Sequence, residues 1–124
     1  KINGFDVIDD SYNISETTAE DGIEYAKKYS KDNNKKLIVI TAGIPELGFE
    51  NKDGNIHLGQ MLNKKANKTI LLESILASEV EKGIENKDLI IKSETMNNAL
   101  EMIKKFDPKK YIVLMQPELN DLYY

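Results

Sequence analysis

Short runs of β-branched and other apolar residues recur along the chain, separated by stretches with helical periodicity. The clearest runs cover residues 37–40, 69–72 and 111–115. Continuous apolar runs of this length are typical of strands that are buried on both faces of a parallel sheet. Strands that alternate with helices imply right-handed βαβ crossovers. The sequence therefore predicts an α/β, Rossmann-like three-layer domain, with a mainly parallel sheet of five to six strands and helices on both faces.

The same periodicity predicts where each element lies. Strands are expected at residues 5–9, 37–40, 69–72, 89–91 and 111–115. Amphipathic helices are expected at about 16–30, 55–66, 76–84 and 94–105, with a turn at 51–54 and a tail at 116–124. Ser15, Ser74 and Ser93 are predicted N-caps, because a serine hydroxyl can accept a hydrogen bond from an unpaired backbone N–H of the first helical turn.

Composition restricts the class of protein. A chain of 124 residues can form one domain with a sizeable core without disulfides. It has a formal charge of −4, with lysines and acids mixed along its length, so neither a nucleic-acid-binding surface nor a membrane-binding surface is expected. The absence of cysteine excludes thiolate metal sites and a cysteine nucleophile. The longest apolar runs are too short to cross a membrane and no signal peptide is recognisable, so a cytoplasmic location is expected.

Two loops are candidate binding loops, because parallel sheets keep their binding groups at the carboxyl ends of the strands. The first expected strand ends in Asp9-Asp10, two carboxylates that point to opposite sides of an extended chain. An aspartate here can either bind a ligand or only cap the following turn. The second loop, residues 41–48, holds Gly43, Glu46 and Gly48. Its glycines allow the backbone to approach a ligand, although a plain connecting loop fits the composition equally well.

Other chemistry finds little support. His57 is the only histidine, and no second ligand stands at metal-binding spacing from it, so no metal site is predicted. No Ser-His-Asp arrangement can be argued, and neither glycine-rich phosphate-binding motif is present. No catalytic residue is assigned, and a triphosphate-binding loop would have to come from outside this chain.

Residues 7–13, Val-Ile-Asp-Asp-Ser-Tyr-Asn, resemble the first strand and loop of the C-terminal domain of the Mur ligase family. Glu46-Leu47-Gly48 matches the E-L-G of that family's second loop, and His57 falls near a frequent family histidine. The likeness is greatest to members that add D-alanyl-D-alanine to UDP-N-acetylmuramoyl tripeptide, in a divergent branch. It covers essentially residues 1–124 as one domain. Because the chain starts without methionine, we expect it to be a fragment of a longer three-domain protein.

This resemblance implies an ATP-dependent amide ligase of peptidoglycan precursor synthesis, whose isolated C-terminal domain is inactive. Its partners would be its own N-terminal and central domains, which hold the UDP-muramoyl peptide and most of the ATP and magnesium. The incoming D-alanyl-D-alanine or amino acid would be the other substrate. The resemblance implies a role in nucleotide or substrate binding for six residues: Asp10, Ser11, Tyr12, Asn13, Glu46 and His57. Asp10 would contact the nucleotide ribose, and Glu46 would position substrate.

The chain also departs from the family pattern. Glu16 replaces a common proline, residues 43–45 replace G-D-M, and Gln116-Pro117-Glu118 replaces the K-G-S that follows the last strand. These departures leave open a degenerate copy that serves as a binding or scaffolding module without catalysis. A folylpolyglutamate synthase is less consistent with the sequence, because those enzymes have Ala-His-Asn-Pro where this chain has the Tyr12-Asn13 loop.

Overall fold

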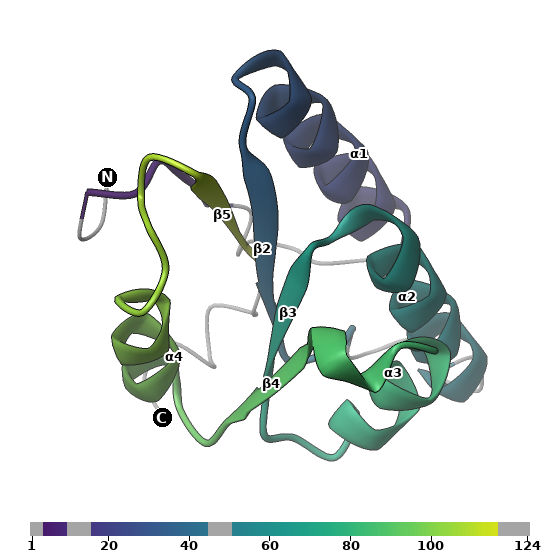
Figure 1. Ribbon diagram of the computed structural model, residues 1–124. Helices are drawn as coiled ribbons and strands as arrows, with labels where there is room; N and C mark the ends of the chain where they lie inside the picture. The colour runs from purple at the N-terminus through teal and green to yellow at the C-terminus, as the bar shows by residue number, and fades with distance from the viewer. Residues whose placement is uncertain (1–3, 10–15, 45–50, 117–124) are drawn as a thin grey trace.

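A computed structural model describes residues 4–9, 16–44 and 51–116, and these form a single five-stranded sheet (Figure 1). Every pair of neighbouring strands is parallel, in the order β1-β5-β2-β3-β4. The strands are β1 (Val7–Asp9), β2 (Lys36–Thr41), β3 (Lys68–Leu72), β4 (Ile90–Ser93) and β5 (Tyr111–Met115). The helices are α1 (Glu16–Asp32), α2 (Asn51–Lys65), α3 (Ala77–Gly83) and α4 (Met96–Ile103), with the short 3₁₀ turn η2 (Lys87–Leu89) before β4. The predicted α/β fold is confirmed.

The helices divide between the two faces of the sheet (Figure 1). Along β2, Leu37 and Val39 face one way and join a core with α1, α2 and α3, whereas Ile38 and Ile40 face the other way and join a core with α4. This alternation follows from the period of two in an extended strand. Both cores are continuous and buried. The first contains Ala19, Ile23, Leu58, Leu62, Leu71, Val80 and Ile84, and the second contains Phe5, Ile70, Leu72, Met96, Ala99, Ile103 and Val113.

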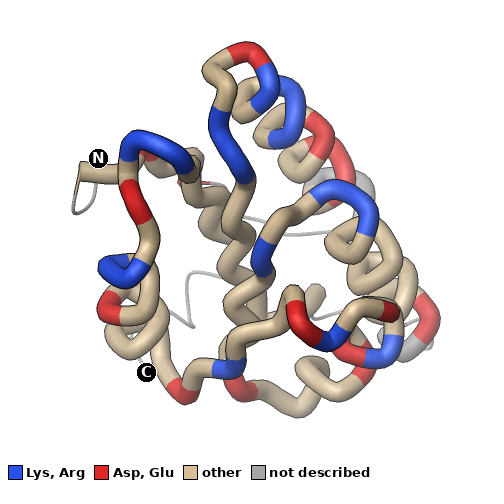
Figure 2. Tube along the Cα trace, in the orientation of Figure 1, with Lys and Arg blue, Asp and Glu red and all other residues tan. Residues whose placement is uncertain are grey.

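Charge is distributed unevenly between the two ends of the parallel strands (Figure 2). We call the side of the sheet where the strands start the amino edge and the side where they finish the carboxyl edge. The strands begin among lysines, since Lys36 opens β2, Lys68 opens β3, and Lys109-Lys110 precede β5. At the opposite edge, Asp9 ends β1, Glu73 follows β3 and Glu94 follows β4. The carboxyl edge of the described sheet is therefore acidic and the amino edge is basic.

The structure corrects three predictions about helix starts. Residues 51–54, predicted as a turn, form the first turn of α2, where Asp53 complements the helix dipole. The cap of α4 is Thr95 rather than Ser93, because the Thr95 hydroxyl accepts from the Asn98 N–H at 3.1 Å while Ser93 ends β4. α3 has no side-chain cap, since Ser74 lies too early and bonds within the preceding loop. Ser15 and the tail at 117–124 lie outside the described residues.

The two helices that flank β3 touch at their backbones. A Cβ added to Gly59 of α2 would lie 2.0 Å from the Val80 carbonyl oxygen of α3, and one added to Gly83 of α3 would lie 2.0 Å from the Ile56 carbonyl oxygen of α2. Only glycine permits this approach, which fixes α3 against the rest of the first core. In the parts of the chain that the structure describes, no helix is both long enough and apolar enough to cross a membrane.

Candidate functional site

The carboxyl edge of the sheet is the candidate site. In open α/β sheets, ligands bind outside the carboxyl ends of the strands. The crevice forms between two neighbouring strands whose following helices lie on opposite faces of the sheet. β3 is followed by α3 on one face, and its neighbour β4 is followed by α4 on the other face (Figure 1). A crevice is therefore expected between the ends of β3 and β4, in addition to the edge formed by β1, β5 and β2.

The loop after β2 is held in place by Asn55. Its Oδ1 accepts from the Ile44 N–H at 2.6 Å, and its Nδ2 donates to the Ile44 carbonyl at 3.0 Å. Asn55 is completely buried on α2. We call this pair of hydrogen bonds between Asn55 and Ile44 the Asn55 clamp. Gly43, the residue before Ile44, has φ +92, and a Cβ added to it would lie 2.8 Å from Leu76 Cβ. Both the conformation and the space therefore require glycine, so Asn55 and Gly43 set the direction in which the chain enters residues 45–50.

The role of Asn55 was not predicted, although the sequence contains a signal for it. Asn55, Leu58 and Leu62 are spaced i, i+3 and i+7, so they share one face of α2. Both leucines are buried. A polar residue on such a face must find buried hydrogen-bond partners, and an asparagine can satisfy one backbone donor and one backbone acceptor together.

The end of β5 is closed by Gln116, which stands where the resemblance to Mur ligases would place the start of a K-G-S motif. Its Nε2 donates to the Ala19 carbonyl at 2.9 Å, and its backbone N–H donates to the Ile40 carbonyl at 2.9 Å. With 1% of its surface exposed, Gln116 ties β5 to α1 and β2. A side chain used in this way is structural and is not presented to a ligand.

Five of the six predicted binding residues, Asp10, Ser11, Tyr12, Asn13 and Glu46, lie outside the described residues. The structure does place the strand that leads to the first motif, because Asp9 ends β1 in register with Met115 of β5. The sixth residue, His57, lies on α2, with its Nδ1 3.0 Å from the Glu20 Oε1 of α1. This contact joins two helices of the same layer, and the binding role suggested for His57 stays a prediction.

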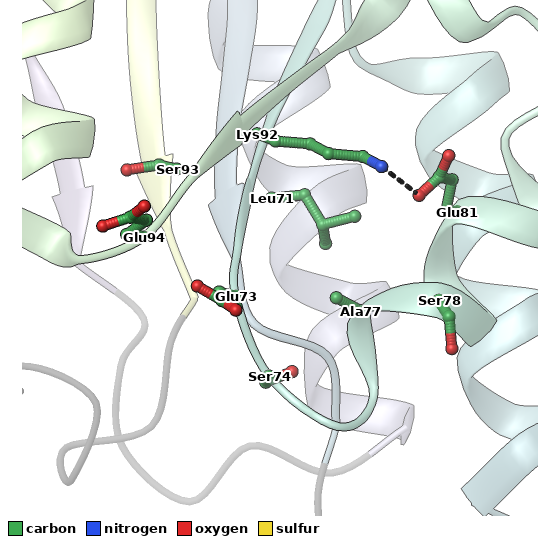
Figure 3. Close-up of a pocket in the computed structure, with 9 residues that line it drawn as sticks. All are labelled: Leu71, Glu73, Ser74, Ala77, Ser78, Glu81, Lys92, Ser93 and Glu94. Carbon is green, nitrogen blue, oxygen red and sulfur yellow. Dashed lines mark ion pairs between the residues drawn. The ribbon is translucent and has the colours of Figure 1, made fainter.

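A hollow of about 510 Å³ lies at this crevice, bounded by the ends of β3 and β4 and by α3 (Figure 3). The Lys92 Nζ and the Glu81 Oε1, 3.0 Å apart, form an ion pair at one end, and Glu73 and Glu94 lie toward the other end. The lining residues are Leu71, Glu73, Ser74, Ala77, Ser78, Glu81, Lys92, Ser93 and Glu94. The Ser74 hydroxyl donates to the Ala42 carbonyl at 2.7 Å, which links this hollow to the loop after β2. The hollow was not predicted, although a glutamate directly follows both β3 and β4 in the sequence.

The described edge suits hydroxyl and ammonium groups better than phosphates. Its carboxylates can accept hydrogen bonds from such groups but would repel a triphosphate. Lys92 is the lysine among the residues that line the hollow, and Glu81 already pairs with it. Among residues 4–9, 16–44 and 51–116, no three histidine, aspartate or glutamate side chains gather closely enough to hold a metal ion.

No protein-family model matches the chain, and no curated protein does. Among solved structures, the fold is similar to that of a domain from a "putative UDP-N-acetylmuramate:L-alanyl-gamma-D-glutamyl-meso-diaminopimelate ligase" of Haemophilus ducreyi 35000HP. The two share 14% sequence identity with a TM-score of 0.58, over 94% of this chain and 85% of that domain. At this identity the similarity establishes a common fold.

Proposed function

We propose that this chain is the C-terminal domain of an ATP-dependent amide ligase of the Mur ligase family, which closes over the other two domains during peptidoglycan precursor synthesis. One observation carries the proposal. The motif Ile8-Asp9-Asp10-Ser11-Tyr12-Asn13 starts at the carboxyl end of β1, which is the ligand-binding edge of an α/β sheet. The fold shared with a domain of a muramate ligase supports the same proposal.

In this proposal the first loop binds the nucleotide and the second loop orients the acceptor. The Asp10 carboxylate accepts hydrogen bonds from the ribose hydroxyls, which suits a group with two acceptor oxygens. Asn13 can supply both a donor and an acceptor to the ligand, and Tyr12 is proposed to contribute to the same site. Glu46 positions the substrate, because the loop that carries it starts from the Asn55 clamp. Buried hydrogen bonds thus fix the start of this second loop, up to Ile44.

ATP, when bound, supplies the phosphoryl group that activates a carboxylate for attack by an amine. The acidic carboxyl edge of this chain fits the ribose and the amine but not the phosphates, so we assign the triphosphate and magnesium to the central domain. This chain contributes orientation and, when the domains close, exclusion of water from the activated carboxylate. The compartment we propose is the cytoplasm, where the nucleotide and the UDP-linked precursors are available.

A second function is favoured by the end of β5. Gln116 stands where the family's K-G-S begins, and it is buried with both of its described hydrogen bonds going to the backbone of the domain. In the family, the loop that begins here faces the substrate, whereas in this chain the position is taken by a buried structural residue. This difference favours a binding or scaffolding module of cell-wall assembly. Such a module would keep the fold and lose turnover.

Phosphate release from ATP, measured with the full-length protein, separates the two functions. Two substrate pairs should be tried: UDP-muramoyl tripeptide with D-alanyl-D-alanine, and UDP-N-acetylmuramate with L-alanyl-γ-D-glutamyl-meso-diaminopimelate. We expect turnover with one pair and a sharp loss in Asp10→Asn, which removes the charge but keeps the shape. Asp21→Asn makes the same change on an exposed position of α1 and should be unaffected. Equal rates in both variants would refute the role of the first loop.

A further inference from the structure

The hollow between β4 and α3 has the size and position of a small-molecule site. Its volume of about 510 Å³ falls within the range of small-ligand pockets, roughly 300–1,000 Å³. It also lies at the ends of β3 and β4, two neighbouring strands after which the chain passes to opposite faces of the sheet. From its lining, we infer that this hollow binds a small molecule through a protonated primary amine, with Glu73 and Glu94 as the counter-charges.

The two glutamates are neighbours at the ends of adjacent strands. Leu72 of β3 is in register with Ser93 of β4, and the Glu73 N–H donates to the Ser93 carbonyl at 2.8 Å. Glu73 and Glu94 are the next residues of the two strands, so their backbones run side by side. Both glutamates are exposed and lie one residue beyond the ends of these strands, and two like charges at adjacent positions repel each other. Neither carboxylate forms an ion pair with any residue that the structure describes. A bound cation would remove this repulsion.

The rest of the lining leaves this negative charge uncompensated. The cation of Lys92 is matched by Glu81 at 3.0 Å, at the end of the hollow away from Glu73 and Glu94 (Figure 3). The lysines that open β2 and β3 lie at the opposite edge of the sheet. The hollow therefore keeps two negative charges that no described lysine neutralises, and a concave surface of one sign attracts ligands of the other sign.

The apolar part of the hollow favours an alkylammonium group over a metal ion. Ala77 and the small exposed part of Leu71 line the hollow with hydrocarbon surface. Such surface gains from contact with an alkyl chain but offers nothing to a hydrated divalent cation, which requires several oxygen ligands. Within the described residues, no third acidic or histidine side chain completes a metal site with this pair. A phosphate or carboxylate ligand would be repelled.

An NMR titration of the ¹⁵N-labelled chain with n-butylammonium chloride tests the inference. We expect saturable shifts of the backbone amides of Ser74, Glu94 and Thr95, which surround the crevice. n-Butanol has the same shape without the charge, and should cause no comparable shift. In the double variant Glu73→Gln/Glu94→Gln, affinity should fall by at least about tenfold, as two charge-assisted contacts are lost. Glu85→Gln, an exposed glutamate elsewhere, is the matched control and should leave affinity unchanged.

Three results would overturn the inference: no shift at these amides, equal shifts with n-butanol, or undiminished affinity in the double variant. Shifts with magnesium chloride but none with the amine would assign the pair to a metal instead, and would also refute it. Should the double variant fail to fold, the salt dependence of wild-type binding decides, because affinity must fall as sodium chloride screens the carboxylates. This titration does not involve ATP or ligation, so its failure can be told apart from a failure of the phosphate-release assay.

Discussion

The glycine contact between α2 and α3 makes a strong prediction about stability. Replacing Gly59 by alanine would put a methyl carbon 2.0 Å from the Val80 carbonyl oxygen and 2.8 Å from Gly83 Cα. Ordinary contact begins at 3.4 Å, so the helices would have to separate by about 1.4 Å, the difference between 3.4 and 2.0 Å. Both opposing atoms belong to backbone, so no side chain can rotate away to relieve the clash.

The expected cost follows from two opposing effects. Overpacking a tight contact costs about 1–3 kcal/mol, and a clash with backbone belongs at the upper end. Alanine in the interior of a helix gains about 1 kcal/mol over glycine. The net effect of Gly59→Ala is therefore a destabilisation of about 2 kcal/mol. With an unfolding entropy of about 2.1 cal/mol/K per residue, this lowers the Tm by about 8 °C.

Urea denaturation followed by circular dichroism measures the change in the free energy of unfolding. Gln60→Ala is the matched control, because Gln60 is the next residue of α2 and is exposed, so its change should stay within about 0.5 kcal/mol. Gly83→Ala should also destabilise, since its Cβ would meet the Ile56 carbonyl oxygen at 2.0 Å. A Gly59→Ala variant as stable as wild type would show that α2 and α3 do not cross in backbone contact.

Two further predictions concern the carboxyl edge. Asn55→Ala should lower the free energy of unfolding by about 2–4 kcal/mol in the same urea experiment, because it leaves both the N–H and the carbonyl of Ile44 without this buried partner; Asn55→Asp should not recover the loss, because it buries a carboxylate with one oxygen against the Ile44 carbonyl oxygen. The 124-residue chain alone should bind ATP with a Kd no tighter than about 1 mM, worth about 4 kcal/mol, because the triphosphate contacts are proposed to lie in another domain. Isothermal titration calorimetry checks this, and micromolar binding would contradict the assignment.

The strands were predictable because their sequence pattern is local and strong. The run 111–115 matches β5 residue for residue, and the runs at 37–40 and 69–72 fall inside β2 and β3. The order of the strands was not predictable, because it depends on which crossovers pass over β5, and no local pattern encodes that. The continuous apolar run of β2 does explain why helices cover both faces of the sheet, because its side chains enter both cores.

Helix starts were less predictable, because capping depends on the exact residue at which the chain turns. Ser93 and Thr95 are both competent caps, and the structure uses Thr95 because Ser93 is still paired in β4 with Leu72. Asn51 to Gly54 resembles a turn by composition, yet it is helical. Buried Asn55, one residue later, anchors this end of the helix to the loop after β2. That long-range contact overrides the local preference of the preceding residues.

The candidate site was predicted as a location but not in its details. The sequence pointed to the carboxyl ends of the first two strands, and the structure places Asp9 and the Asn55 clamp there. It did not reveal the hollow beside Glu73 and Glu94, because the two glutamates come from strands that only the fold brings together. The roles of Asp10 to Asn13 and of Glu46 stay predictions.

The most direct test of the proposed function is to detect the amide product itself. The full-length protein would be incubated with ATP, magnesium and each of the two substrate pairs, and the UDP-linked products analysed by mass spectrometry. Our account predicts one product whose mass equals that of the muramoyl precursor plus the acceptor minus water, formed only when ATP is present. A folded protein that forms no such product with either pair would contradict the ligase function and favour the binding module.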